Sequence, residues 1–288
     1  MKTYFDCIPC LLRQTLDVTR KITSDEVQQE QIIRAVLKET SRANLLESPP
    51  MLAWRIHHLI KKLTGVQDTY QEIKEFSNKL ALKMLPELKE KLNHAEDPLE
   101  MAVRLAIAGN IIDFGVTGDL DWRMVEETIQ GALSASFDTR GLDLLRKRLG
   151  TAKRIVYLTD NAGEIIFDRL VIEQLPLDAV TVVVKAAPII NDAVMEDAKV
   201  AGLTELVKVI DNGMDAPGTV LSLCSPEFLK FFENADVVIA KGQGNYESLS
   251  DAPREVFFLL KAKCAMVAKH LHCQVGNFIL KAGGHPQD

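Results

Sequence analysis

The feature that most constrains this fold is a change in sequence pattern near residue 150. Before this point, apolar residues recur at spacings of three and four between charged residues, which is typical of amphipathic helices. Proline at 49, 50 and 98 fits the first turn of a helix, where a missing N–H does no harm. Residues 1–150 are therefore predicted to form an all-helical region, whose clearest helices are 25–40, 49–65, 68–92 and 97–115.

After residue 150, short β-branched runs alternate with helical stretches. Continuous apolar runs of this length indicate strands buried on both faces, and the intervening segments are long enough for helical crossovers. The predicted strands are 154–158, 179–185, 206–211 and 235–240, with late strands at 264–271 and 277–281. Region 151–288 is thus predicted to be α/β: a three-layer α/β/α sandwich with a mainly parallel, Rossmann-like sheet, on which the helical region 1–150 packs.

Charge and composition exclude several classes of protein. The chain has 288 residues, 47% of them hydrophobic, and a net charge of −6, so it has enough apolar residues for a core and lacks the basic surplus of a nucleic-acid-binding protein. It shows no signal peptide and no run of the roughly 20 apolar residues that span a bilayer. We expect a cytoplasmic protein without a nucleic-acid or membrane partner, which could form a homo-oligomer.

Polar residues follow the predicted strands directly. Because ligands bind outside the carboxyl ends of parallel strands, we expect these residues to gather around one cleft. They are Asp160, Asn161 and Glu164 after the first strand, Lys185 and Asp192 after the second, Asp211 and Asn212 after the third, and Lys241, Gly242, Gly244 and Asn245 after the fourth.

Three of these residues offer oxygen atoms as ligands, which suit a hard cation. Asp160, Asn161 and Asp192 would suit Mg²⁺ or Mn²⁺, and the absence of histidine from these segments argues against zinc. The alternative is that they cap the helices that follow the strands. Lys185 and Lys241 could each hold an anion such as phosphate, or could extend to solvent; Gly242 would let the backbone approach a ligand closely.

Four motifs taken together resemble the damage-control phosphatase family, also called the acidic-residue methyltransferase-like family. They are GNIIDFG (109–115), DNAGE (160–164), KAAPIINDA (185–193) and KGQGNYE (241–247). The resemblance covers nearly the whole chain, and the opening DCIPCLLRQ is similar to the microbial branch that carries an N-terminal CxxC motif.

The resemblance implies a metal-dependent phosphatase that hydrolyses small phosphorylated metabolites, such as sugar phosphates or damaged intermediates, with Mn²⁺, Mg²⁺, Co²⁺ or Ni²⁺. By motif, the metal ligands are Asp160, Asn161 and Asp192, and the catalytic residues are Asp160, Asp192 and Lys241, with Lys241 on the phosphate. The expected substrate contacts are Asn110, Asp113, Glu164, Lys185, Gly242 and Asn245. Glu164 departs from some relatives because it follows Asp160 by four residues rather than five.

The cysteines suggest a second site. Cys7 and Cys10 have the spacing of zinc ligands, iron–sulfur ligands or a redox pair. Cys264 and Cys273, with His270 and His272 nearby, could complete such a site if the N-terminus lies against the last strands. Equally, the cysteines could simply be buried as small apolar residues. His57 and His58 are expected at a helix surface or boundary.

Two other functions remain open at this point. The first is an S-adenosylmethionine-dependent carboxyl methyltransferase, although a Gly-rich loop would then be expected where Asp160 and Asn161 stand. The second is a non-catalytic module that binds a metal or metabolite and responds to redox state through Cys7 and Cys10.

Overall fold

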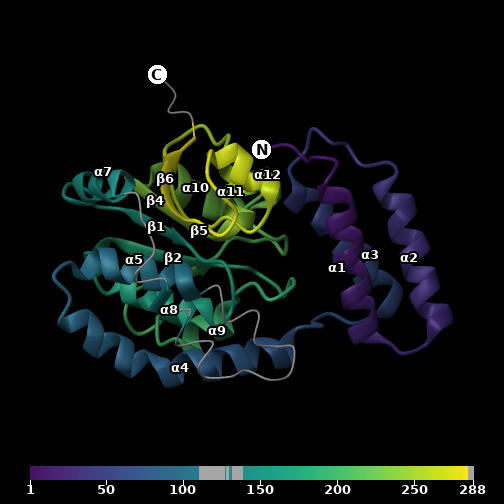
Figure 1. Cartoon of the computed structure of the whole chain (residues 1–288), viewed down its shortest axis with the longest axis horizontal. Helices are drawn as coiled ribbons and strands as arrows, with labels where there is room; N and C mark the ends of the chain where they lie inside the picture. The colour runs from purple at the N-terminus through teal and green to yellow at the C-terminus, as the bar shows by residue number, and fades with distance from the viewer. Residues whose placement is uncertain (110–126, 128–129, 132–138, 285–288) are drawn as a thin grey trace.

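A six-stranded sheet forms the centre of the molecule (Figure 1). The computed structural model describes residues 1–109, 127, 130–131 and 139–284. The strand order is β3-β2-β1-β4-β5-β6, and neighbouring strands are parallel except β5 and β6. The strands are β1 (Ile155–Leu158), β2 (Val180–Val184), β3 (Lys208–Asp211), β4 (Val237–Lys241), β5 (Val256–Lys261) and β6 (Phe278–Gly283). The predicted α/β class with a mainly parallel sheet is confirmed.

Helices cover both faces of the sheet. Successive side chains of a strand point to opposite faces of the sheet. On β1, Tyr157 packs against one helical layer and Val156 against the other. The first layer contains α4 (Gln71–Asn93), α5 (Pro98–Ala108), α7 (Arg140–Leu149), α8 (Glu164–Ile172) and α9 (Met195–Val200). The second contains α10 (Pro226–Asn234), α11 (Gly242–Leu249) and α12 (Ala265–Leu271). Short 3₁₀ turns occur at Leu177–Ala179 and Leu221–Leu223.

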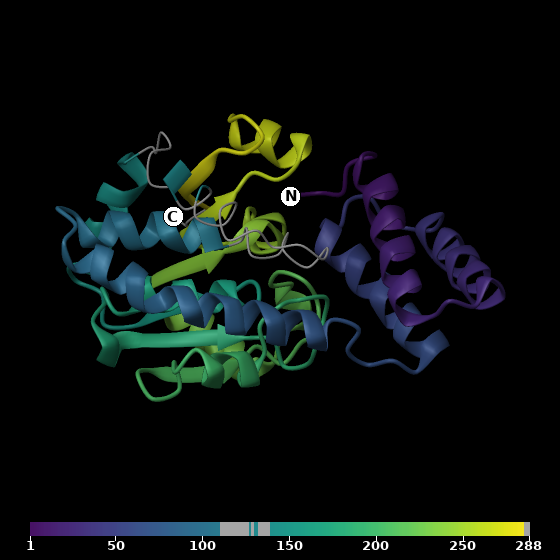
Figure 2. The ribbon, with the colours of Figure 1, turned by 60° about the horizontal axis from the view of Figure 1, so that its bottom comes forward.

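The first three helices form a lobe beside the sandwich, as Figures 1 and 2 both show. They are α1 (Cys7–Ile22), α2 (Glu26–Thr40) and α3 (Pro49–Thr64), and their buried residues form a separate core around Val18, Val36 and Ile56. The helices of region 1–150 are therefore divided between this lobe and the first layer of the sandwich. Helix α7 ends at Leu149, and the first strand begins at Ile155.

The lobe is joined to the sandwich through α3. The Lys61 ammonium donates to the Pro188 carbonyl at 2.7 Å and to Asp215 at 3.0 Å, and the Trp54 indole donates to the same Asp215 carboxylate at 3.1 Å. Prolines open α3 and Gly65, at φ 75°, ends it, as the sequence pattern predicts. None of the helices in the described ranges is long and apolar enough to span a bilayer.

Two expectations about local structure were wrong, and one strand was missed. Residues 265–271 form helix α12 rather than a strand, because Val267, Ala268 and Leu271 face the core at helical spacing and the Cys264 sulfur accepts a hydrogen bond from Val267 N at the first turn. The fully apolar run 256–260 is strand β5, which the sequence analysis did not identify. His57 is buried, with 7% of its surface exposed.

Candidate functional site

The loops after β1 and β2 pair with each other at the carboxyl edge of the sheet. Asn161 and Asp192 form an isolated antiparallel bridge, in which Ala193 N donates to the Asp160 carbonyl at 2.8 Å and Ala162 N donates to the Asn191 carbonyl at 2.9 Å. Because β1 and β2 are adjacent and parallel, both loops leave the sheet at the same edge. This pairing brings together Asp160, Asn161 and Asp192, the three expected metal ligands.

The Asn161 side chain is oriented by two carboxylates. Its amide nitrogen donates to Asp160 Oδ2 at 2.9 Å and to Glu164 Oε2 at 3.0 Å, and all three residues are buried. Both N–H groups are thereby directed toward acids, so the carbonyl oxygen is the atom that Asn161 can offer to a cation. Glu164, at the first position of α8, thus supports the Asn161 amide.

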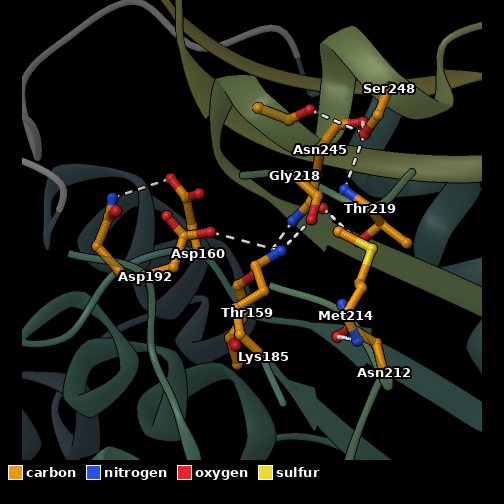
Figure 3. Close-up of polar contacts among 12 residues, drawn as sticks. Thr159, Asp160, Lys185, Asp192, Asn212, Met214, Gly218, Thr219, Asn245 and Ser248 are labelled. Atoms are coloured by element: carbon orange, nitrogen blue, oxygen red, sulfur yellow. Dashed lines mark hydrogen bonds and ion pairs between the residues drawn. The ribbon is translucent and has the colours of Figure 1, made fainter. Parts of the chain in front are cut away.

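Asp192 carries a buried oxygen that forms an ion pair but no hydrogen bond with the described residues. Its Oδ2 lies 3.4 Å from the Lys185 ammonium and has no hydrogen-bond partner among the residues that the structure describes. Burial raises the pKa of Asp192 to about 6, although the neighbouring Lys185 opposes this rise. Lys185, only 3% exposed, also donates to the Gly218 carbonyl. Figure 3 shows Lys185 directed at Gly218 and Asp192, with Asp160 beside them.

The first residue of α11, directly after β4, closes the site against Asp160. Gly242 has φ 81°, and a Cβ at this position would lie 1.9 Å from Asp160 Oδ2. Only glycine combines this backbone conformation with this approach. The sequence analysis expected Gly242 to contact a ligand; the structure places it in contact with the Asp160 carboxylate.

Lys241 is placed differently from its expected position on the phosphate. The side chain is fully buried, and its ammonium donates to Glu164 Oε1 at 2.7 Å, to Asp168 Oδ1 and to the Ala106 carbonyl at 2.9 Å. These three bonds use all of its donors. Burial lowers the pKa of Lys241, but Asp168 and Glu164 outweigh this effect and hold it above its usual value. Lys185 is the ammonium beside Asp192.

Asn245, expected to touch substrate, is engaged in holding the fold together. Its amide nitrogen donates to the carbonyls of Thr159 at 3.1 Å and Lys241 at 2.7 Å, and its oxygen accepts from Thr219 Oγ1 at 2.7 Å. It therefore fixes the ends of β1 and β4 and the 219 loop relative to one another. Figure 3 shows Asn245 between Thr159 and Thr219. Asn110 and Asp113 lie outside the described residues.

Two residues that support the site were missed by the sequence analysis. Asn78 of α4 accepts a hydrogen bond from Gly163 N at 2.7 Å, and Asp168 accepts from the Tyr157 hydroxyl at 2.9 Å as well as from Lys241. Burial raises the pKa of Asp168 to about 6, although Lys241 opposes this rise. A signal for Asp168 was present, because Glu164 and Asp168 stand four residues apart in a helix whose other residues, apart from Arg169, are apolar, so the two acids share one face.

The cysteines meet at a separate pocket. Cys7, Cys10 and Cys264 line a cavity of about 280 Å³, whereas His272 and Cys273 line another. Within the described ranges, no three side chains of His, Cys, Asp or Glu are placed to hold one metal ion. A cation between Asp160 and Asp192 would therefore need the Asn161 oxygen as well.

Comparison with known proteins identifies the family. A family model described as the damage-control phosphatase ARMT1-like domain matches residues 3–278. The chain belongs to this family. The resemblance inferred from the four motifs is thereby confirmed.

Similar proteins of this family occur in archaea. A damage-control phosphatase of Archaeoglobus fulgidus is 36% identical over 96% of this chain and 97% of its own length. A damage-control phosphatase of Pyrococcus horikoshii is also 36% identical, over 97% of each chain. The crystal structure of a DUF89 family protein from P. horikoshii superimposes with a TM-score of 0.88 at 35% identity, covering 97% of this chain and 98% of that one.

Proposed function

We propose that this protein is a metal-dependent phosphatase that hydrolyses small phosphorylated metabolites. Family membership supports phosphatase chemistry, since the relatives from A. fulgidus and P. horikoshii are named damage-control phosphatases. The observation that carries the proposal is the cluster of Asp160, Asn161 and Asp192 beside the Lys185 ammonium, at the sheet edge where α/β proteins bind ligands.

The donor set fits a hard divalent cation. Asp160 and Asp192 would supply carboxylate oxygens, and Asn161 an amide oxygen, which are ligands preferred by Mg²⁺ and Mn²⁺. The Asp192 Oδ2 atom supports this assignment, because a buried carboxylate oxygen without a hydrogen bond is costly unless a ligand satisfies it. Co²⁺ and Ni²⁺ remain further candidates for the same ligands.

The residues of this chain then have distinct roles in phosphate-ester hydrolysis. A divalent cation, when bound, supplies Lewis-acid polarisation of the phosphoryl group. Lys185 would contact a phosphoryl oxygen and offset its charge, a role that we assign to it in place of Lys241. Lys241 would act as a positioning residue, because it fixes Glu164, which in turn orients Asn161. The burial of these side chains limits access of bulk water to the site.

Replacement of the two aspartates tests this proposal. We expect Asp192→Asn and Asp160→Ala to lose metal-stimulated phosphate release while retaining the circular dichroism spectrum and cooperative melting of the parent. The exposed Asp178→Asn serves as the control carboxylate change and should remain active. The measurement is phosphate release from a panel of phosphometabolites, each with Mn²⁺, Mg²⁺, Co²⁺ or Ni²⁺.

The screen, run beside assays of methyl transfer and of metabolite binding, also tests the methyltransferase and the binding module. Full activity in both Asp192→Asn and Asp160→Ala would contradict the proposed centre. Methyl transfer from S-adenosylmethionine without phosphate release would favour the methyltransferase, and tight metabolite binding without turnover would favour a binding module.

A further inference from the structure

Cys7 and Cys10 occupy the first turn of α1, three residues apart. In an α-helix, the Cα atoms of residues three positions apart are about 5 Å from each other. This distance lies within the Cα–Cα range of disulfide-bonded cysteines. Both thiols are free, Cys10 is exposed and Cys7 is half-buried. The pair therefore has both the accessibility and the spacing that a reversible disulfide needs.

The pair opens onto a pocket that also contains an acid. The pocket of about 280 Å³ is walled by the first turns of α1, α3 and α12 and by α11, and is mostly apolar. Glu247 of α11 lines it and accepts a hydrogen bond from Gln243 Nε2 at 2.8 Å; the same nitrogen lies 3.7 Å from Cys264 Sγ. Burial raises the pKa of Glu247 to about 7, so near neutral pH this carboxyl group can both accept and release a proton.

The structure favours redox chemistry over metal binding at these thiols. In the part of the chain that the structure describes, no three His, Cys, Asp or Glu side chains are arranged around one ion. The Cys264 sulfur, the third thiol of the pocket, already accepts a hydrogen bond from Val267 N at 3.5 Å as the cap of α12. Burial raises the pKa of Cys7 and Cys10, as do nearby Glu247 and Cys264, so a thiol here needs a proton acceptor to react.

We propose that Cys7 and Cys10 form a reversible dithiol–disulfide couple that exchanges with small-molecule disulfides, with Glu247 as the proton acceptor. The more exposed Cys10 sulfur attacks one sulfur of the small disulfide and breaks its S–S bond, which gives a mixed disulfide. The Cys10 proton passes through Glu247 to the departing sulfur, which leaves as the first small thiol. The Cys7 sulfur then attacks the Cys10 sulfur, its proton passes to Glu247, and the second small thiol leaves with that proton. The protein loses two electrons and two protons, and the small disulfide gains them.

Oxidised glutathione tests the disulfide directly. We incubate the full-length protein with it under anaerobic conditions and map disulfides by peptide mass spectrometry. The expected product is one Cys7–Cys10 bond, with an intact mass about 2 Da below that of the dithiol, reversed by dithiothreitol. Cys7→Ser should stop at a glutathione adduct on Cys10, whereas Cys10→Ser should form neither product. Cys264→Ser and Cys273→Ser serve as controls and should oxidise as the parent does.

The rate of disulfide formation tests the role of Glu247 as the proton acceptor. Glu247→Gln keeps the size of the side chain, and its melting temperature reports whether the fold is intact. We expect disulfide formation in this variant to slow on the order of 10-fold, and an unchanged rate would remove Glu247 from the mechanism. The dithiol proposal is overturned if oxidation yields no Cys7–Cys10 bond. It is equally overturned if purified protein holds a metal ion that Cys7→Ser releases.

Discussion

Replacing Gly242 with alanine should displace the Asp160 carboxylate from the metal site that we propose. The new Cβ would lie 1.9 Å from Asp160 Oδ2, whereas ordinary contact begins at 3.4 Å, so the carboxylate must move by 3.4 − 1.9 = 1.5 Å. Metal–ligand distances tolerate about 0.2 Å. A displacement of this size should therefore remove one ligand and lower phosphate release by about 10²-fold or more.

The same change also costs stability, because Gly242 has φ 81°. A side chain in this left-handed region costs about 1–2 kcal/mol. Gly65→Ala is the matched control: its φ is 75°, and its Cβ would meet nothing within 4 Å. Gly65→Ala should lose only this conformational cost, whereas Gly242→Ala should lose more free energy of unfolding because its Cβ must also displace the buried Asp160 carboxylate. Only Gly242→Ala should lose activity.

Two measurements separate these effects. Urea unfolding gives the free energy of unfolding, and calorimetric titration with Mn²⁺ gives cation affinity independently of turnover. We expect weak Mn²⁺ binding only in Gly242→Ala. If Gly242→Ala binds Mn²⁺ and releases phosphate as well as Gly65→Ala does, then the contact with Asp160 has no part in the site and the reasoning is refuted.

Two further predictions concern charged groups. Lys185→Gln removes the ammonium group 3.4 Å from Asp192 and should lower kcat/KM by about 10²-fold. It should not weaken Mn²⁺ binding, because the lost ammonium carries the same sign of charge as the cation. Weaker Mn²⁺ binding with unchanged kcat/KM would contradict this assignment. Burial, followed by Lys61 and His58, lowers the pKa of His57 to about 4. The unfolded chain therefore takes up a proton near pH 6.5 that the folded protein does not, so His57 should contribute a loss of about 3 kcal/mol from pH 6.5 to 4. Urea titrations should find this loss as the difference between the parent and His57→Phe, since Asp168, Asp192 and Glu247, whose pKa values burial raises, titrate in both proteins.

The sequence pattern predicted the fold class because buried parallel strands and amphipathic helices differ in period. It failed at residues 256–260 and 265–271, where short apolar runs fit either a strand or a helix and tertiary packing decides between them. It also could not separate the α1–α3 lobe from α4 and α5, because all five helices show similar amphipathic periodicity. The two groups of helices differ only in the elements against which they pack: α4 and α5 pack against the sandwich, whereas α1–α3 pack against one another.

The sequence predicted those parts of the candidate site whose position depends only on where the strands end. Asp160, Asn161 and Asp192 follow adjacent parallel strands, so topology alone brings them together. The roles of the two lysines depend on neighbours that the strand pattern does not reveal. Lys241 meets Glu164 and Asp168 from α8, whereas Lys185 meets Asp192 and a loop carbonyl.

The charge balance of the site leads to a final prediction, on cation removal. Among the described residues, the buried carboxylates are Asp160, Glu164, Asp168, Asp192 and Asp197, which carry −5 when ionised, and the buried ammonium groups are Lys74, Lys185 and Lys241, which carry +3, so the balance is −5 + 3 = −2. A divalent cation would neutralise this charge, whereas without one the excess destabilises the fold.

Mn²⁺ at 100 times its dissociation constant should therefore raise the free energy of unfolding by about 2.7 kcal/mol, and a chelator should remove this gain. Thermal melting of the parent with Mn²⁺ and with EDTA measures the difference without any substrate. Asp192→Asn removes a ligand and one unit of negative charge, so its two melting curves should coincide. If the parent melts identically in Mn²⁺ and EDTA, the cluster binds no stabilising cation, and the excess charge must be balanced by protons on the carboxylates.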